Sequence, residues 1–357
     1  MPPPPRSEPL LAALRLVAPG TPLREGLERN IQARMGALIV VGAGPEVLSV
    51  CSGGFLLDAE FTPQRLSELA KMDGAIILTA DCSRIVRANV HLVPDPNIPT
   101  SETGTRHRTA ERVARQIAVP VITISEDRSE VAIHVRGQKR AIEPTPRVLA
   151  RADQALQILE RYKNRLDAVS QSLSALEVED LVTVRDVATV LQRAEMVRRI
   201  SQEIEGYVIE LGADGRLVLL QLEELMGGVE DDRRLVAKDY YAKRPDFELV
   251  DVMKKLSELD DDALLDLNEV FGVLELPEGY TLDSPVQPRG FRLLHKIPRL
   301  PEIVSDHVVD RFENLQKILR ASEADLVQVE GVGDARARAI KDGLARLAES
   351  SILERYT

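Results

Sequence analysis

The sequence lacks several features that define common classes of protein. Tryptophan is absent and aromatic residues make up only 3% of the 357 residues, so the cores must be built from aliphatic side chains. Its two cysteines, Cys51 and Cys82, belong to no CxxC or Cys/His pattern, which excludes a disulfide framework and a zinc site. No apolar run approaches the roughly 18 residues of a membrane-spanning helix, so we expect no membrane attachment.

The beginning of the chain also lacks the pattern of a signal peptide. Prolines follow Met1 where basic residues would be needed, and Arg15 interrupts the first apolar stretch. We expect a disordered tail of about eight residues and a protein of the reducing cytoplasm. The length is sufficient for two or three domains, each with its own core.

Two widespread phosphate-binding motifs are missing as well. Residues 42–44 (GAG) lack the third glycine of a dinucleotide-binding fingerprint, and GxxxxGK[ST] occurs nowhere in the sequence. Ordinary Rossmann and P-loop chemistry are therefore poor explanations for any phosphate site in this chain.

The formal net charge of −11 is distributed unevenly. Residues 1–147 carry 18 Lys+Arg against 16 Asp+Glu, residues 148–285 carry 16 against 30, and residues 286–357 carry 12 against 11. The acidity therefore belongs to the middle segment, which should repel nucleic acid. Both ends remain free to meet anionic ligands.

The first segment, residues 1–147, alternates strand and helix patterns. Thr62-Pro63 is typical of a helix start and predicts a helix to about residue 72, and the apolar spacing of residues 110–117 predicts an amphipathic helix. Short apolar runs predict strands at residues 36–42, 47–51, 75–79, 85–93, 120–125, 131–135 and 140–143. We expect an α/β domain with one mixed sheet.

Residues 103–109 (TGTRHRT) stand at the beginning of the amphipathic helix. Free backbone N–H groups and the positive end of the helix dipole are available there. Arg106, His107 and Arg108 add charged donors suited to a polyphosphate, and Thr105 and Thr109 add hydroxyl groups. The same residues are equally compatible with a solvated helix start whose arginines pair with nearby acids.

A carboxylate that could hold a divalent metal stands before a predicted buried strand, in the motif Asp73-Gly74-Ala75. Magnesium and manganese prefer carboxylate and phosphate oxygens, often with only one or two protein carboxylates. Gly74 would let the backbone approach a ligand closely. Taken alone, Asp-Gly is more commonly a simple turn between a helix and a strand.

Together, Asp73-Gly74-Ala75 and Arg106-His107-Arg108 resemble the paired signature, DGA and RHR, of the diadenylate cyclases. The surrounding text, SGGFLLDAEFTPQRLSELAKMDGAIIL and LVPDPNIPTSETGTRHRTAERVA, resembles the DNA-integrity scanning branch of that family. The resemblance covers essentially the full length. It implies that two ATP molecules, one on each of two facing protomers, are joined into cyclic di-AMP with release of two pyrophosphates.

The resemblance also implies a role for each motif residue. Asp73 would bind Mg2+ or Mn2+ and help to deprotonate or orient the 3′-hydroxyl that attacks the α-phosphorus. Arg106 and Arg108 would clamp the phosphates, because positioning and charge neutralisation dominate such a reaction. His107 would donate to a phosphate oxygen, with a general-acid role as the weaker alternative. The remaining nucleotide contacts would come from Gly74, Ala75, Leu92, Thr105, Thr109 and Ser125.

One position departs from the family pattern. After Ser125 some relatives continue with basic residues, whereas here Glu126 and Asp127 precede Arg128. Glu126 would either assist with the metal or weaken a phosphate contact, so these three residues are left out of the predicted site.

The middle segment begins with the most regular periodicity in the chain. Apolar residues between positions 148 and 176, spaced alternately by four and three, predict one long helix with a heptad seam. This helix would be either a spine that packs against a neighbouring subunit or part of an intramolecular bundle. Further helices are predicted at residues 183–211, 217–226, 231–242 and 249–271, the last interrupted at 260–262. No catalytic pattern appears among them, so we assign the segment to spacing and assembly.

A linker rich in proline and glycine, residues 282–292, leads to the third segment. There residues 324–340 (ADLVQVEGVGDARARAI) resemble a helix-hairpin-helix motif. Gly331, Val332 and Gly333 would form its tight turn, whose N–H groups face a DNA phosphate without reading the bases.

Cations next to this turn would strengthen binding to DNA. Arg336, Arg338 and Lys341 would add a salt-dependent attraction. Residues 297–301 (IPRLP) are a candidate for a degenerate first hairpin. Hairpins of this kind also serve protein contacts, and the net charge of the segment is small for a DNA-binding domain.

We therefore expect a multidomain chain with an α/β diadenylate cyclase domain at residues 1–147, an all-α spine or bundle at 148–285 and a helix-hairpin-helix domain at 286–357. The expected partners are ATP, branched or junction DNA bound without sequence specificity, and further copies of the chain. The resemblance implies an octamer with face-to-face cyclase domains and a cytoplasmic, nucleoid-associated location. The alternative is a non-catalytic, nucleotide-sensing DNA-binding or repair scaffold.

Overall fold

The computed structural model describes residues 7–126, 129–244 and 246–355, with side chains as far as residue 349. The chain forms two compact units, Met1–Leu156 with Glu203–Gln221 and Gln157–Gln202 with Leu222–Thr357. Most of the predicted N-terminal tail, residues 1–6, lies outside the described part of the chain. Helix α1 (Glu8–Leu16) already begins at Glu8, so the tail was predicted too long.

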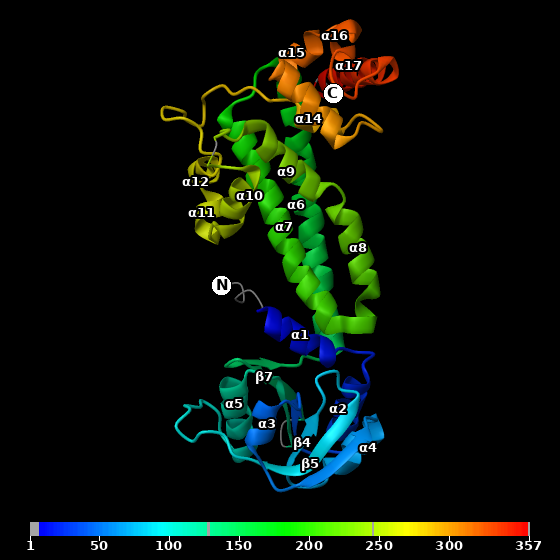
Figure 1. Cartoon of the computed structure of the whole chain (residues 1–357), viewed down its shortest axis with the longest axis vertical. Helices are drawn as coiled ribbons and strands as arrows, with labels where there is room; N and C mark the ends of the chain where they lie inside the picture. The colour runs from blue at the N-terminus through cyan, green and yellow to red at the C-terminus, as the bar shows by residue number, and fades with distance from the viewer. Residues whose placement is uncertain (1–6, 127–128, 245, 356–357) are drawn as a thin grey trace. The chain divides into compact units, whose positions relative to one another are not determined.

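The first unit is built on one mixed β-sheet (Figure 1). Its strands follow the order β2-β5-β4-β1-β6-β7-β8, and β3 pairs with β5. β1 (Ala37–Val41) and β4 (Ala75–Leu78) are parallel, and the other pairs are antiparallel. The other strands are β2 (Cys51–Ser52), β3 (Phe55–Glu60), β5 (Arg84–Leu92), β6 (Val121–Ser125), β7 (Glu130–Val135) and β8 (Gln138–Ala141). The predicted mixed-sheet α/β domain is confirmed.

Helices cover both faces of this sheet, so the central strand β1 is buried on both sides. Because side chains alternate along a strand, Leu38 of β1 belongs to one core and Ile39 to the other. One face is covered by α3 (Pro45–Ser49) and α5 (Thr105–Ile117), and the other by α1, α2 (Pro22–Gln32) and α4 (Pro63–Leu69).

The predicted strand at residues 47–51 is wrong. Gly44 is the N-cap and Pro45 the first residue of the short helix α3, because proline fixes a helical φ and needs no N–H there. Strand β3 has no counterpart among the predicted strands. Its residues Phe55, Leu56 and Leu57 are consecutive and exposed, so they show no alternation of apolar and polar side chains.

Helices dominate the chain after β8. They are α6 (Thr145–Glu179), α7 (Val184–Leu211), α8 (Arg216–Met226), α9 (Val229–Tyr240), α10 (Leu249–Glu258), α11 (Asp261–Leu265) and α12 (Leu267–Gly272). The interruption predicted at 260–262 is confirmed, since the Asp260 side chain caps α11 by accepting from the N–H of Ala263. The heptad-seam residues Leu159, Leu166 and Leu173 are buried within the single chain, which favours an intramolecular bundle.

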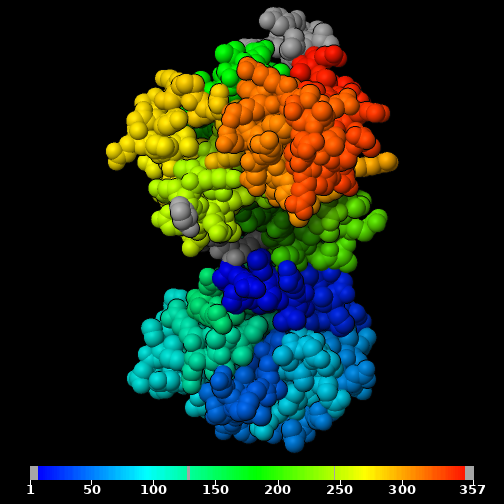
Figure 2. Space-filling view, turned by 45° about the horizontal axis from the view of Figure 1, so that its top comes forward, coloured from blue at the N-terminus to red at the C-terminus, as the bar shows by residue number. Residues whose placement is uncertain are grey.

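The last helices of the second unit share a further core, and they form one continuous surface in orange and red in Figure 2. They are α13 (Phe291–His295), α14 (Glu302–Phe312), α15 (Leu315–Arg320), α16 (Glu323–Val327) and α17 (Asp334–Arg355). Within the residues described, no helix is long and apolar enough to cross a membrane.

A buried ion pair fastens α13 to α6 inside the second unit. The side chains of Arg292 and Glu177 are both fully buried, and Arg292 Nη2 lies 2.6 Å from Glu177 Oε2. The hydroxyl of Tyr240 donates to Glu177 at 2.8 Å. Asp239 accepts the backbone N–H groups at the start of α13, including that of Arg292 at 3.0 Å. Each buried charge therefore has polar partners.

Candidate active site

Three segments that are distant in the sequence meet at one edge of the sheet, where β1 and β4 begin and β6 ends. Asp73 stands two residues before the first residue of β4, and the parallel register of β1 with β4 brings Gly36, just before β1, beside it. β6 runs antiparallel to β1, so Ser125 at the end of β6 reaches the same edge. The topology therefore brings together the carboxylate of Asp73, the backbone of Gly36, which has no side chain, and the hydroxyl of Ser125.

Helix α5 begins above this edge. Its N-cap Gly104 has a φ of 82°, in the left-handed region that favours glycine. Thr105, Arg106 and His107 occupy the first turn. The guanidinium group of Arg106 lies against Gly36, where an added Cβ would clash with Arg106 Nη1. The position of Arg106 thus depends on the absence of a side chain at residue 36.

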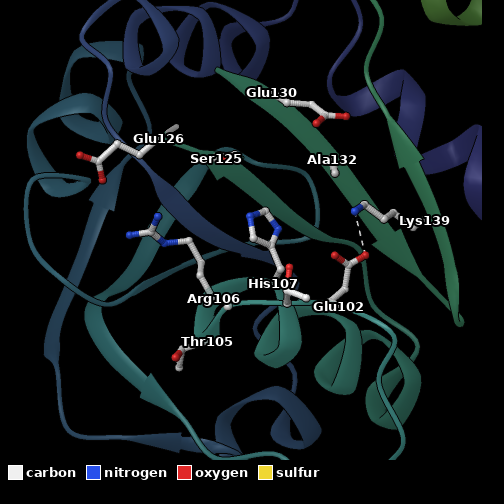
Figure 3. A pocket seen from close by; sticks show the side chains of 11 residues that line it. Glu102, Thr105, Arg106, His107, Ser125, Glu126, Glu130, Ala132 and Lys139 are labelled. Carbon is white, nitrogen blue, oxygen red and sulfur yellow. Dashed lines mark ion pairs between the residues drawn. The ribbon is translucent and has the colours of Figure 1, made fainter. Parts of the chain in front are cut away.

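A pocket of about 400 Å3 opens beside the start of α5 (Figure 3). Its volume is that of a typical small-molecule site. The lining residues are Glu102, Thr103, Gly104, Thr105, Arg106, His107, Ser125, Glu126, Glu130, Ala132 and Lys139. His107 lies between Arg106 and Lys139 in Figure 3. Four of the predicted site residues, Thr105, Arg106, His107 and Ser125, therefore share one pocket.

The loop before α5 is held by a buried carboxylate of that helix. Glu111 is 6% exposed and accepts hydrogen bonds from Thr100 Oγ1 at 2.5 Å and Ser101 N at 3.0 Å. Arg115 Nη2 lies 2.6 Å from the same carboxylate. Burial alone would raise the pKa of Glu111, but these partners hold it below its usual value. The loop that supplies part of the pocket wall is thus fixed to α5.

Buried polar side chains lie on the α5 face of the sheet, next to the pocket. Thr123 and His134 face each other on β6 and β7, with 3.4 Å between Oγ1 and Nε2. Burial lowers the pKa of His134 to about 4, so its ring is neutral at pH 7. On β8, Lys139 Nζ lies 2.7 Å from Glu102 Oε1, a residue of the loop before α5.

Two predicted residues of α5 lie outside the pocket lining. Arg108 is exposed, and a helix turns by about 100° per residue, so it projects from a different side of α5 than Arg106. Thr109 is half-buried in the second turn. Glu126 does line the pocket, whereas Asp127 and Arg128 lie outside the described residues.

The predicted contacts on β4 and β5 are buried in the sheet. Leu92 is 5% exposed and Ala75 is fully buried, so only their backbone groups can meet a ligand. An added Cβ at Gly74 would lie 2.7 Å from the backbone of Asn89. Gly74 is therefore required for the close approach of β5, whatever it does toward a nucleotide.

Asp73 suits a metal that is shared with a substrate. Its side chain is exposed at the sheet edge. Among the described residues, no group of three or more His, Cys, Asp or Glu side chains forms a metal cage. One carboxylate completed by phosphate oxygens is a normal arrangement for Mg2+ or Mn2+. The donor set fits a divalent metal that arrives with a nucleotide.

The predicted DNA-contacting turn joins α16 to α17. Gly331 has a φ of 82°, in the region that favours glycine, and an added Cβ at Gly333 would meet nothing within 4 Å. Val332 is buried and donates its N–H to the carbonyl of Val329 at 3.0 Å. The turn is thus held by its core residue, while the two glycines beside it are exposed.

The three predicted cations near this turn all have partners within the chain. Arg336 Nη1 donates to the carbonyl of Gly331 at 2.6 Å, and Lys341 Nζ donates to the carbonyl of Leu319 at 2.8 Å. Arg338 lies 3.5 Å from Glu323 in an exposed pair, which contributes little stability. Arg338 is therefore the cation that can most readily turn to another anion.

The turn between α13 and α14 repeats this geometry at a constant offset in the sequence. Arg299 has a φ of 63°, the counterpart of Gly331. The N–H of Leu300 donates to the carbonyl of Ile297 at 3.3 Å, as Val332 donates to Val329. Residues 297–301 thus share a left-handed residue and a turn hydrogen bond with the second turn.

Several residues in or next to the pocket carry no recognisable signal in the sequence. Gly36 is noticeable only as the residue before a buried strand. Glu102 and Lys139 meet through the pairing of β8 with β7, which no local spacing indicates. Glu111 sits on the apolar face of α5 and could have been singled out as a charge at a core position.

Comparisons with known proteins agree with this architecture. The family described as "DisA bacterial checkpoint controller nucleotide-binding" (DAC) matches residues 24–139, and the family "DisA bacterial checkpoint controller linker region" matches residues 142–282. The first match covers strands β1 to β7, Asp73 and the start of α5. Fold and site thus define a diadenylate cyclase.

Curated relatives resemble the chain along its whole length. The DNA integrity scanning protein DisA of Frankia alni is 55% identical over 355 residues, covering 99% of both chains. The protein of the same name from Streptomyces coelicolor is 56% identical over 97% of this chain and 93% of its own. The one from Kineococcus radiotolerans is 56% identical over 98% of both. The chain belongs to the DNA integrity scanning protein DisA family.

Proposed function

We propose that this protein condenses two molecules of ATP into cyclic di-AMP, with release of two pyrophosphates, and that it couples this reaction to the binding of branched DNA. The observation that carries the proposal is the meeting of Asp73, Arg106 and Ser125 around one sheet edge, beside the pocket at the start of α5. A carboxylate, a guanidinium group and a hydroxyl are the groups that hold a nucleotide triphosphate and its metal.

Within one protomer, the phosphates of ATP enter the pocket. Arg106 and His107 donate to phosphate oxygens, and Thr105 and Ser125 add hydroxyl or backbone donors. The N–H groups at the start of α5 complete the cradle, since their dipoles favour an anion. This arrangement aligns the α-phosphorus for in-line attack by a 3′-hydroxyl.

Asp73 would hold Mg2+ or Mn2+ together with phosphate oxygens. When bound, such a metal neutralises phosphate charge and lowers the pKa of the attacking hydroxyl. Its position at the sheet edge lets Asp73 orient that hydroxyl and accept a hydrogen bond from it. The backbone groups of Gly74, Ala75 and Leu92 would contact the adenosine.

Each protomer holds one ATP, so the reaction requires two protomers with facing sites. The exposed side of α5 that carries Arg108 would face the second nucleotide in such a pair. Thr109, the next residue, would add a hydroxyl donor. We propose that the protein assembles into an octamer in which the cyclase domains meet face to face.

The C-terminal helices would bind DNA as a helix-hairpin-helix domain. The turn with Gly331 and Gly333 is exposed and lies before the long helix α17, so its N–H groups can face a phosphate without reading bases. The repeated hairpin at residues 297–301 supports this assignment, because paired hairpins can meet both strands of a duplex. Arg336, Arg338 and Lys341 would add attraction to the backbone.

We propose a division into residues 1–147 for the cyclase, 148–285 for the helical linker and 286–357 for the DNA-binding part, with a cytoplasmic, nucleoid-associated role as a DNA-integrity checkpoint. Stoichiometry tests the reaction. With ATP and Mg2+ or Mn2+, two pyrophosphates should appear for each cyclic di-AMP. Pyrophosphate without cyclic dinucleotide would indicate simple hydrolysis and would contradict the proposal.

A further inference from the structure

The pocket extends beyond the motif residues toward β8. Lys139 enters from that strand, and Figure 3 shows its ammonium group beside Glu102 and on the same side as the His107 ring. The distance from Lys139 Nζ to Glu102 Oε1 is 2.7 Å. The Lys139 side chain is 42% exposed, so it remains accessible from the pocket while it is paired.

The register of the sheet explains why Lys139 faces α5. Lys139 pairs with His134 across β8 and β7. Paired residues project from the same face of a sheet, and His134 meets Thr123 on the α5 face. Lys139 therefore shares this face with the pocket lining, and the apolar residues between these positions supply the opposite core.

The cations in the pocket form a row across the strands. Arg106 lies over the start of β1, and the ammonium of Lys139 reaches inward from the far strand. β1 and β8 are three strand spacings apart, roughly 14 Å, and the long Lys139 side chain shortens that span. A single phosphate cannot span that row, whereas a chain of phosphates can.

The carboxylates in the lining lie at different places along this row. Glu102 is already paired with Lys139, Glu126 lies on the Arg106 side of the pocket in Figure 3, and Glu130 lies on the other side of Lys139 from Glu102. Glu102 is only 16% exposed and its backbone N–H donates to Thr100 Oγ1 at 3.1 Å, so it holds the ammonium group in place. A phosphate group of a bound ligand can then accept a further hydrogen bond from the Lys139 ammonium group.

We propose that Lys139 binds the terminal phosphates of ATP and the pyrophosphate that leaves, with Glu102 as its partner when the pocket is empty of anion. The proposal rests on the proposed function. The adenosine and the α-phosphate belong at the edge with Asp73, so the far end of the row receives the phosphates that are lost in the reaction. Cyclic di-AMP has no such phosphates and makes no use of Lys139.

Binding measurements in the full chain test this assignment. Calorimetry with Mg2+ would compare 3′-deoxy-ATP, which has no 3′-hydroxyl and cannot react, with pyrophosphate, AMP and cyclic di-AMP. In Lys139→Met, 3′-deoxy-ATP and pyrophosphate should bind about ten-fold more weakly, since one charge-assisted hydrogen bond is lost. The affinities for AMP and cyclic di-AMP should be unchanged. Lys139→Arg should restore binding.

Two further variants serve as controls. Lys71→Met removes a charge of the same domain that is paired with Glu68 at the surface, so it should change none of the four affinities. Glu102→Gln keeps the loop contact and frees Lys139, so 3′-deoxy-ATP should bind at least as well as to the wild type.

Equal weakening of all four ligands in Lys139→Met would mean that the lysine only supports the loop, and unchanged binding of 3′-deoxy-ATP would mean that it does not reach the phosphates. Either result overturns the assignment. Product analysis of the wild type with ATP stands apart from these measurements. Tight binding with the predicted differences but no cyclic di-AMP would contradict the proposed function and leave the role of Lys139 intact.

Discussion

The guanidinium group of Arg106 occupies the space above Gly36 that a side chain would fill, so an added Cβ would clash with Nη1. This contact links the helix start that carries the RHR motif to the sheet edge that carries Asp73. Because the two motifs are separated in the sequence, their cooperation depends on the bare backbone between them.

Gly36→Ala should therefore impair nucleotide binding without unfolding the domain. The added methyl group displaces the flexible end of Arg106, so we expect the KM for ATP to rise about ten-fold, which is the loss expected for one charge-assisted contact. Gly44→Ala is the matched control, since its Cβ would meet nothing within 4 Å. A normal KM in Gly36→Ala would show that the position of Arg106 is unimportant.

The exposed turn before α17 allows a DNA contact to be removed while the fold is kept. Gly333→Ala places a methyl group in open space, so the thermal midpoint should not change, but the methyl should obstruct a phosphate. We expect about ten-fold weaker binding to a four-way junction at fixed salt, measured by fluorescence anisotropy. Gly272→Ala, with equally open space, is the control. Full junction affinity in Gly333→Ala would move the DNA site elsewhere.

His134 should make the stability of the first unit sensitive to acid. Burial lowers its pKa from 6.5 to about 4, so the unfolded chain takes up a proton at a higher pH than the folded one. Stability is therefore complete above pH 6.5 and is lost as the pH falls toward 4, by at most about 3 kcal/mol. Denaturant unfolding of wild type and His134→Gln would show a shallower pH slope in the variant. Equal slopes would contradict the burial argument.

The buried pair between Arg292 and Glu177 should show strong coupling. Arg292→Met leaves the Glu177 carboxylate buried without its cation, so we expect a loss of about 3–5 kcal/mol in the free energy of unfolding. Adding Glu177→Gln removes the stranded charge and keeps an acceptor for Tyr240, so the double variant should recover part of that loss. Additive losses in this double-mutant cycle would show that the two side chains do not interact.

The sequence predicts the motif residues better than it predicts their surroundings. Asp73 and the residues from Arg106 to Arg108 are recognisable because local patterns place them at the start of a strand and of a helix. Gly36 and Lys139 are not, since strand register brings them to the site. Register depends on the tertiary fold, which no local pattern reports.

The secondary structure shows the same division. Long periodic helices such as α6 and α7 are predicted within a few residues of their ends, because each turn repeats the signal. The short helix α3 was mistaken for a strand, since five residues with two apolar side chains fit either period and only Pro45 marks the helix start. The exposed strand β3 carries no alternation and was missed.

Product analysis with a matched pair of variants shows directly whether the protein makes cyclic di-AMP. The purified chain, Asp73→Asn and the control Asp153→Asn on the exposed surface of α6 would each be incubated with ATP and Mg2+ or Mn2+, and the products identified by mass spectrometry. We expect cyclic di-AMP from the wild type and from Asp153→Asn, none from Asp73→Asn, and unchanged junction affinity in all three. Unchanged ATP from the wild type under both metals would contradict the proposed synthesis and would leave a nucleotide-sensing DNA-binding protein as the better explanation.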